Sequence, residues 1–156
     1  LRLGRSDTPV FTTPESPFEV GKAQLFYKKS ETLATSVAII ATGTLTYEAL
    51  LAAQTLEADG VGVSVLHVPS IKPFDSAAVV ALARTHTALV TLEEHQRIGG
   101  LGSAVAEAVA ETYPAPVHRL GIHDEFGQSG EPAELLAHYG LDAKGVAAAV
   151  RQILGR

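Results

Sequence analysis

The stretch TSVAIIATGTLTYEALLAAQTLEADG, Thr35 to Gly60, decides the fold class. Its first part, TSVAIIATG, is a nearly continuous apolar and β-branched run, which is typical of a strand buried on both faces of a parallel sheet. The remainder has helical periodicity, with one apolar stripe made of Ala49, Ala52, Ala53 and Leu56. We expect Thr46 to cap the start of this helix and Gly60 to follow its end.

The same alternation of strand and helix continues along the chain. Val61 to Val68 and Ala88 to Glu93 are predicted strands, and Asp75 is the expected N-cap of the helix between them. The helix after the second of these strands should bury one face, made of Leu101, Val105, Ala108, Val109 and Thr112. Alternation with such short connections predicts a three-layer α/β/α sandwich around a mostly parallel sheet.

The two ends of the chain complete this picture. A further strand is predicted in APVHRLGI, and its polar His118 and Arg119 place it at a sheet edge. Pro132 should start the next helix, which Gly140 ends, and Asp142 should cap the last one. At the other end, the proline-rich segment 6–20 is typical of an extended arm, followed by a short hairpin or first strand.

Composition restricts the function classes. The chain has 156 residues, enough for one domain, a net charge of −5 and a pI of about 5.6. The sequence has no basic stripe of the kind that would favour a nucleic-acid partner, and it has no apolar run as long as a membrane helix. The absence of cysteine excludes thiolate metal sites and is compatible with a cytoplasmic location. The start LRLGR, without Met, indicates a piece of a longer protein.

Polar residues follow the predicted strands, where ligands bind in open parallel sheets. These residues define a candidate crevice for a small effector: Thr42, Gly43, Thr44, His67, Glu93 and His95. The Gly43 turn could bind an anion at the helix N-terminus, as in flavodoxins, or could simply turn the chain. The threonine spacing of flavodoxins is not matched, and no aromatic flank offers a stacking surface.

No catalytic or metal-binding residue is assigned from these patterns. Glu93, Glu94 and His95 lack the spacing of metal ligands, even together with His67. The glycines of the segment 99–102 stand too far from the strand for a dinucleotide loop, and no G-x-S-x-G surrounds a serine nucleophile. The phosphoacceptor aspartates of response regulators are also missing.

A resemblance becomes specific in VTLEEHQRIGGLGSAVAE, residues 90–107. The segments FEVGKA, VAIIATGTLTYEALLAA, IKPFD and GIHDEFGQSGEPAELLAHYGLDAKGV fit the same family in order. Together they resemble the C-terminal domain of transketolase-like enzymes, with the C-terminal subunit of split transketolases as the nearest type. The resemblance extends over essentially the whole chain.

This resemblance implies a fold and a division of the chain. It implies a five-stranded, mostly parallel sheet with one antiparallel strand. Residues 1–20 would be the end of a preceding pyrimidine-binding domain with an extended linker, and residues 21–156 the transketolase C-terminal domain. Arg2 matches the arginine that grips the substrate phosphate in relatives, so that role is expected for it in the intact enzyme.

The resemblance also implies function and partners. Transketolases use thiamine diphosphate and Mg²⁺ to move a two-carbon ketol unit between sugar phosphates, and other domains bind that cofactor. The chain lacks the Gly-Asp-Gly cofactor signature. It is therefore expected to be inactive alone, to join diphosphate- and pyrimidine-binding domains or a subunit carrying them, and to support a homodimer. The alternatives are a regulatory effector-binding module and a flavodoxin-like electron carrier.

Overall fold

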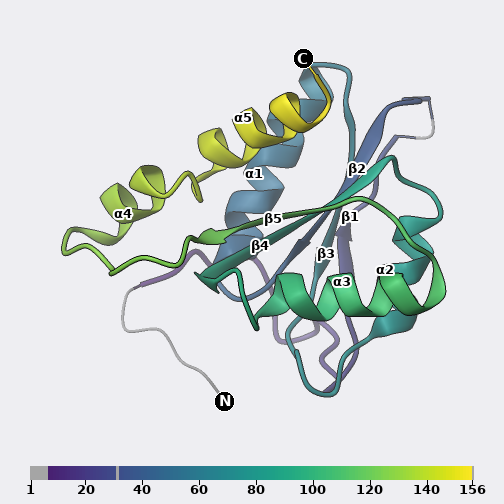
Figure 1. Ribbon diagram of the computed structural model, residues 1–156, viewed down its shortest axis with the longest axis horizontal. Helices are drawn as coiled ribbons and strands as arrows, with labels where there is room; N and C mark the ends of the chain where they lie inside the picture. The colour runs from purple at the N-terminus through teal and green to yellow at the C-terminus, as the bar shows by residue number, and fades with distance from the viewer. Residues whose placement is uncertain (1–6, 31, 156) are drawn as a thin grey trace.

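The structure is a computed structural model, and it describes residues 7–30 and 32–155. One sheet forms its centre (Figure 1). The strands of this sheet are β1 (Gln24–Tyr27), β2 (Ser36–Ala41), β3 (Gly62–His67), β4 (Ala88–Gln96) and β5 (Val117–Ile122). Their order is β1-β3-β2-β4-β5, and only the pairing of β1 with β3 is antiparallel within the described chain. The five-stranded, mostly parallel sheet is confirmed.

Helices cover both faces of the sheet (Figure 1). They are α1 (Leu45–Ala58), α2 (Ser76–Ala83), α3 (Leu101–Thr112), α4 (Pro132–His138) and α5 (Ala143–Ile153). Helices α1 and α5 share one apolar cluster with the sheet, and α2 and α3 share another. Strand β2 is central and contributes alternate side chains to the two clusters, so Ile39 faces α1 while Ile40 faces the α2 and α3 side. The sandwich therefore has the predicted three layers.

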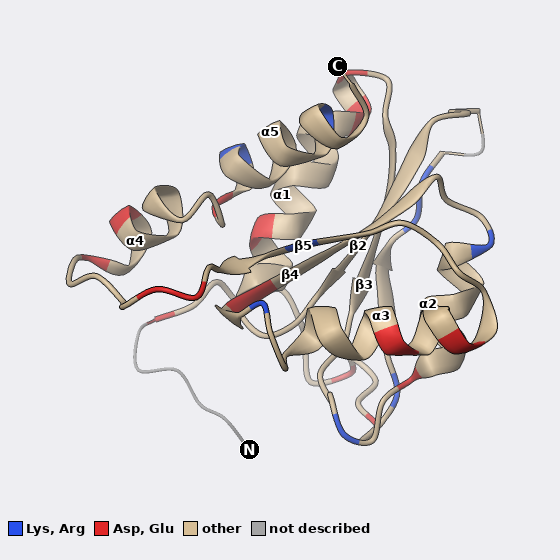
Figure 2. Cartoon of the chain, in the orientation of Figure 1, with Lys and Arg blue, Asp and Glu red and all other residues tan. Residues whose placement is uncertain are grey.

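Several predicted boundaries hold. The carboxylate of Asp75 accepts a hydrogen bond from Ala78 N at the start of α2, and Asp142 does the same for Gly145 N at the start of α5. Pro132 begins α4, Gly140 follows it with a φ of 66°, and β5 is an edge strand. Charged residues lie mainly on helices and connections, with an acidic stretch at the end of β4 (Figure 2).

Three predictions about single positions are wrong. Thr46 does not cap α1, because the helix already begins at Leu45 and Thr46 is fully buried inside it. Strand β4 continues to Gln96, three residues beyond the predicted end, since Gln96 still pairs with Ile122 of β5 after an irregularity in the register. Thr112 is exposed rather than buried, because α3 ends there.

Candidate functional site

The parallel strands end on one side of the sheet, and we call this side, with the segments that follow the strands, the carboxyl edge. The ends of β2 and β3 are fastened together there: the Thr42 hydroxyl donates to the Val68 carbonyl at 2.7 Å. Thr42 N also donates to the Leu92 carbonyl of β4 at 3.3 Å. The next residue, Gly43, is exposed with a φ of 61°, a conformation that favours glycine, and leads directly into α1.

His67 ends β3 and is held from two directions. Its ring stacks on Phe26 of β1, with centroids 5.3 Å apart and planes 13° apart. Its Nδ1 lies 2.8 Å from the Thr46 hydroxyl, which is the reason that Thr46 faces inward. Burial lowers the pKa of His67 below the ordinary 6.5, so the ring is neutral at pH 7.

Aromatic rings continue this contact outward. Phe11 of the N-terminal arm meets Phe26 edge to face at 5.9 Å and stacks on Tyr47 at 6.0 Å. An aromatic surface therefore lies beside the Gly43 turn, where the sequence pattern predicts none. Phe11 belongs to a segment without periodicity, so no local signal could place it. The arm packs on the domain at this point.

Glu93 has the position of a catalytic carboxylate but a structural use. Its side chain is 1% exposed, and its two oxygens accept from Leu101 N at 2.7 Å and Gly102 N at 2.8 Å. A carboxylate at a helix N-terminus satisfies free N–H groups and the helix dipole. A Cβ at Gly100 would lie 2.0 Å from Glu93 Oε2, so glycine is required beside it. Both oxygens of Glu93 are thus engaged by the backbone of α3.

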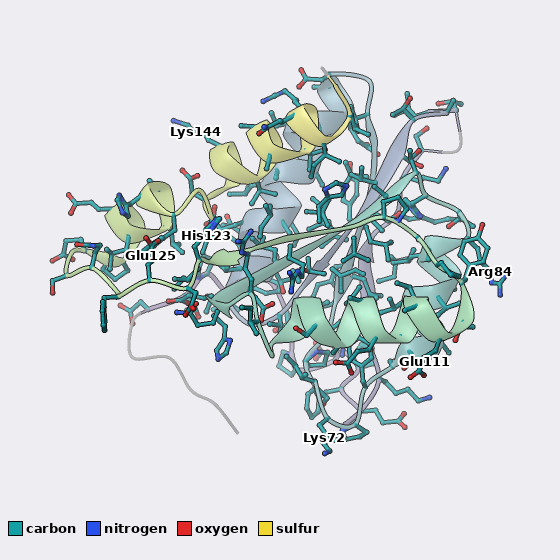
Figure 3. The ribbon with its side chains drawn as sticks, in the orientation of Figure 1. Lys72, Arg84, Glu111, His123, Glu125 and Lys144 are labelled. Atoms are coloured by element: carbon teal, nitrogen blue, oxygen red, sulfur yellow. The ribbon has the colours of Figure 1, made fainter. Side chains whose placement is uncertain are left out.

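The loops after β4 and β5 are joined by basic side chains. Arg97 Nη2 lies 2.9 Å from His123 Nδ1, and Arg119 Nη1 donates to the Arg97 carbonyl at 3.0 Å. His95 points to solvent, with Nδ1 3.0 Å from the Gln96 carbonyl. Figure 3 shows His123 and Glu125 at this end of the molecule.

The six predicted crevice residues therefore share the carboxyl edge but have different surroundings. Gly43 and His95 are exposed, Thr42, Thr44 and His67 are half-buried, and Glu93 is enclosed. In residues 7–30 and 32–155, no group of three or more His, Asp or Glu side chains is placed to hold a metal ion. Arg2 lies outside the described residues. Effector binding at this edge stays a prediction.

One cavity, of about 370 Å³, lies between β5 and α5. Its lining includes His118 and Arg119 of β5, Ile153 of α5, and Arg97 from the segment after β4. No helix in the described part of the chain has the length and apolarity to cross a membrane.

The fold and edge define an α/β/α domain of the doubly wound type, whose central carboxylate holds a helix rather than a substrate. A model of the family "Transketolase, C-terminal domain" matches residues 28–146, and the chain belongs to this family.

Relatives agree. The chain is 39% identical over its full length to the 6-deoxy-6-sulfo-D-fructose transketolase subunit SqwH of Clostridium sp. (strain MSTE9), and spans 47% of it. It is 50% identical over 117 residues, 74% of its length, to the 1-deoxy-D-xylulose-5-phosphate synthase of Leptothrix cholodnii (strain ATCC 51168 / LMG 8142 / SP-6), spanning 18% of that enzyme. A solved structure is described as a split gene transketolase, an inactive beta4 tetramer. The match to it covers 97% of this chain and 48% of the chain in that structure, at 45% sequence identity and a TM-score of 0.88.

Proposed function

We propose that this chain is the C-terminal domain of a thiamine-diphosphate-dependent transketolase, which moves a two-carbon ketol unit between sugar phosphates. In this proposal it helps to assemble a cytoplasmic homodimer and is inactive alone. The observation that carries the proposal is the match at a TM-score of 0.88 over 97% of the chain to a split transketolase, of which it covers only 48%.

The lengths of the relatives support the need for further domains. The chain spans 47% of the Clostridium subunit and 45% of a subunit of the apulose-4-phosphate transketolase of Phocaeicola vulgatus (strain ATCC 8482 / DSM 1447 / JCM 5826 / CCUG 4940 / NBRC 14291 / NCTC 11154). The solved relative is described as an inactive tetramer, and inactivity of the chain by itself is expected here too. In this proposal, the diphosphate- and pyrimidine-binding domains supply the reaction centre.

Thiamine diphosphate and Mg²⁺ are assigned in this proposal to those other domains. In support of this assignment, both oxygens of the buried Glu93 are engaged by backbone N–H groups of α3. No chemical step is therefore assigned to this chain. Arg2, in the segment proposed to end the pyrimidine domain, would hold the substrate phosphate of the intact enzyme.

The alternative function is a regulatory module that binds a small effector at the carboxyl edge. The exposed Gly43 turn beside the rings of Tyr47 and Phe11 favours it, since such a surface could hold an anionic aromatic molecule. Thermal unfolding with sugar phosphates and nucleotides tests this alternative. A rise in melting temperature with any of them would support it, and no rise with all of them would count against it.

Reconstitution tests the leading proposal. The purified chain is mixed with a chain that carries the diphosphate- and pyrimidine-binding domains, and ketol transfer from a ketose phosphate is measured with added thiamine diphosphate and Mg²⁺. Activity should appear only in the mixture, and Arg2→Ala should raise KM for the phosphorylated sugar. Transfer by this chain alone, or none in the mixture, would overturn the proposal.

A further inference from the structure

Exposed large hydrophobic side chains are concentrated on one side of this domain. Single exposed apolar residues are normal on protein surfaces, but a set gathered on one side marks a contact surface. Of those in residues 7–30 and 32–155, all except Tyr113 lie at the carboxyl edge or beside it. They are Val10, Phe18, Val20, Leu25, Ile71, Ile98 and Phe126.

The topology explains why segments far apart in sequence share this edge. Ile71, Ile98 and Phe126 lie in the connections that follow β3, β4 and β5, whose parallel strands all end there. The start of β1 lies there as well, because β1 is antiparallel and Gln24 pairs with His67, the last residue of β3. Figure 1 shows β4 and β5 pointing toward the side where the described N-terminal segment begins.

Specific contacts hold these segments in place. Ala23 N donates to Asp75 Oδ2 at 3.0 Å, and a Cβ at Gly21 would meet Pro73, so the segment before β1 lies against the β3–α2 connection. Phe11 stacks on Tyr47 of α1, and this contact holds the arm, including the neighbouring Val10, against the domain. The contact of Arg97 with His123 joins the loops that carry Ile98 and Phe126.

The apolar side chains on this edge are unusually open to water. Phe126 is 97% exposed, Val10 90% and Ile98 70%. Phe11 and Phe26 on the same edge, by contrast, pack against other rings of the domain. Burying large apolar side chains is favourable in proportion to their area, so the exposed positions gain most from a partner that covers them.

We propose that the carboxyl edge, centred on Ile98 and Phe126, is the face by which this chain docks against the diphosphate- and pyrimidine-binding part of the enzyme. The inference rests on the proposed function and specifies the surface. Two observations indicate which partner covers this face. The relatives described as subunits are about twice as long as the part that this chain spans, so they carry further domains. In addition, residues 7–20 enter the domain across this same edge. Docking would cover Gly43 and His95, so effector binding at this edge would compete with assembly.

Two substitutions on the edge and one away from it test the proposal. Ile98→Asp and Phe126→Asp place a charge on exposed side chains and should leave the fold intact. Tyr113→Ser is the matched control, because Tyr113 is an exposed large hydrophobic residue at the opposite end, where its ring contacts Arg84. Figure 3 shows Arg84 and Glu111 at that end. Circular dichroism checks that each variant is folded.

The measurement is the affinity of each variant for a purified chain carrying the diphosphate- and pyrimidine-binding domains, by titration calorimetry. Each edge variant should bind at least about 10-fold more weakly than the unsubstituted chain, and Tyr113→Ser should bind equally well. Hydrogen exchange in the complex should protect the loops 97–100 and 123–131.

The outcomes separate the two proposals. Equal binding by all variants, with protection elsewhere, would overturn the docking face and leave the proposed function standing. Loss of self-association rather than of partner binding would assign the edge to a second copy of this chain and overturn the proposal. No binding by the unsubstituted chain would overturn both.

Discussion

Glu93 and Thr91 lie two positions apart on β4, and both are buried polar residues. They differ in whether their side chains have hydrogen-bond partners. Both Glu93 oxygens accept hydrogen bonds from the first turn of α3. Among the side chains described, the Thr91 hydroxyl is the buried polar atom without a partner. A buried group with partners stabilises the fold, while one without them costs free energy.

Glu93→Gln should lower the free energy of unfolding by about 2–3 kcal/mol. The amide keeps the shape but turns one acceptor into a donor that faces a backbone N–H, and it removes negative charge from the helix N-terminus. Urea unfolding measures the change. The control is Glu107→Gln, an exposed carboxylate on the same helix, which should change stability by less than about 0.5 kcal/mol. Equal effects at both positions would contradict the capping role.

Thr91→Val should raise the free energy of unfolding by about 1 kcal/mol. Valine has nearly the same shape and a high preference for strands, and it removes the unpartnered hydroxyl. The same urea experiment measures it. A loss of stability would show that the hydroxyl has a partner after all, such as an ordered water molecule.

At the scale of elements, the helix ends divide into those held by a side chain and those held by packing. Asp142 holds the start of α5 through its bond to Gly145 N, 2.8 Å long. The last turn of α5 is joined to α1 by the ion pair of Arg151 with Asp59, 2.6 Å apart. These side chains are 38% and 45% exposed, so water weakens the pair.

Asp142→Ala should therefore cost about 1 kcal/mol of stability, and Asp59→Asn less than about 0.5 kcal/mol. Thermal unfolding at low and at moderate salt compares the two variants. Only the loss of stability caused by Asp59→Asn should become smaller as salt is added. An ion-pair variant that loses more stability than the cap variant would reverse this order.

The elements are predictable because their signals are local. The apolar run of β2, the stripe of α1 and the aspartates before α2 and α5 each act through near neighbours in sequence. The prediction for Thr46 fails because its hydroxyl bonds to His67, 21 positions away. Phe11 and the two bonds of Glu93 likewise depend on tertiary neighbours, so local patterns do not predict the surroundings of the candidate site.

At the scale of the whole molecule, two half-buried histidines, His67 and His86, connect folding to pH. Burial lowers the pKa of His67, and burial, followed by the nearby charge of Lys29, lowers the pKa of His86 despite its bond to the Leu82 carbonyl. The unfolded chain takes up protons on these rings from about pH 6.5 downward, while the folded chain resists them. Stability is therefore retained above that pH and lost as pH falls below it.

The free energy of unfolding should consequently fall as the pH drops below 6.5, and that of the His67→Gln, His86→Gln double variant should fall less steeply. Urea titrations at several pH values give both slopes. Parallel slopes would mean that other groups, such as carboxylates, determine the acid sensitivity.

The glycines beside Glu93 have a consequence for reading genomes. Gly100 has no room for a side chain because of Glu93 Oε2, and Gly102 has none because of Arg119 and Thr91. The segment 93–102 is thus restricted by steric fit, and any copy of this domain would keep these glycines as long as it folds in this way. Finding this segment in a genome therefore counts domains with this fold, whatever reaction their proteins carry out.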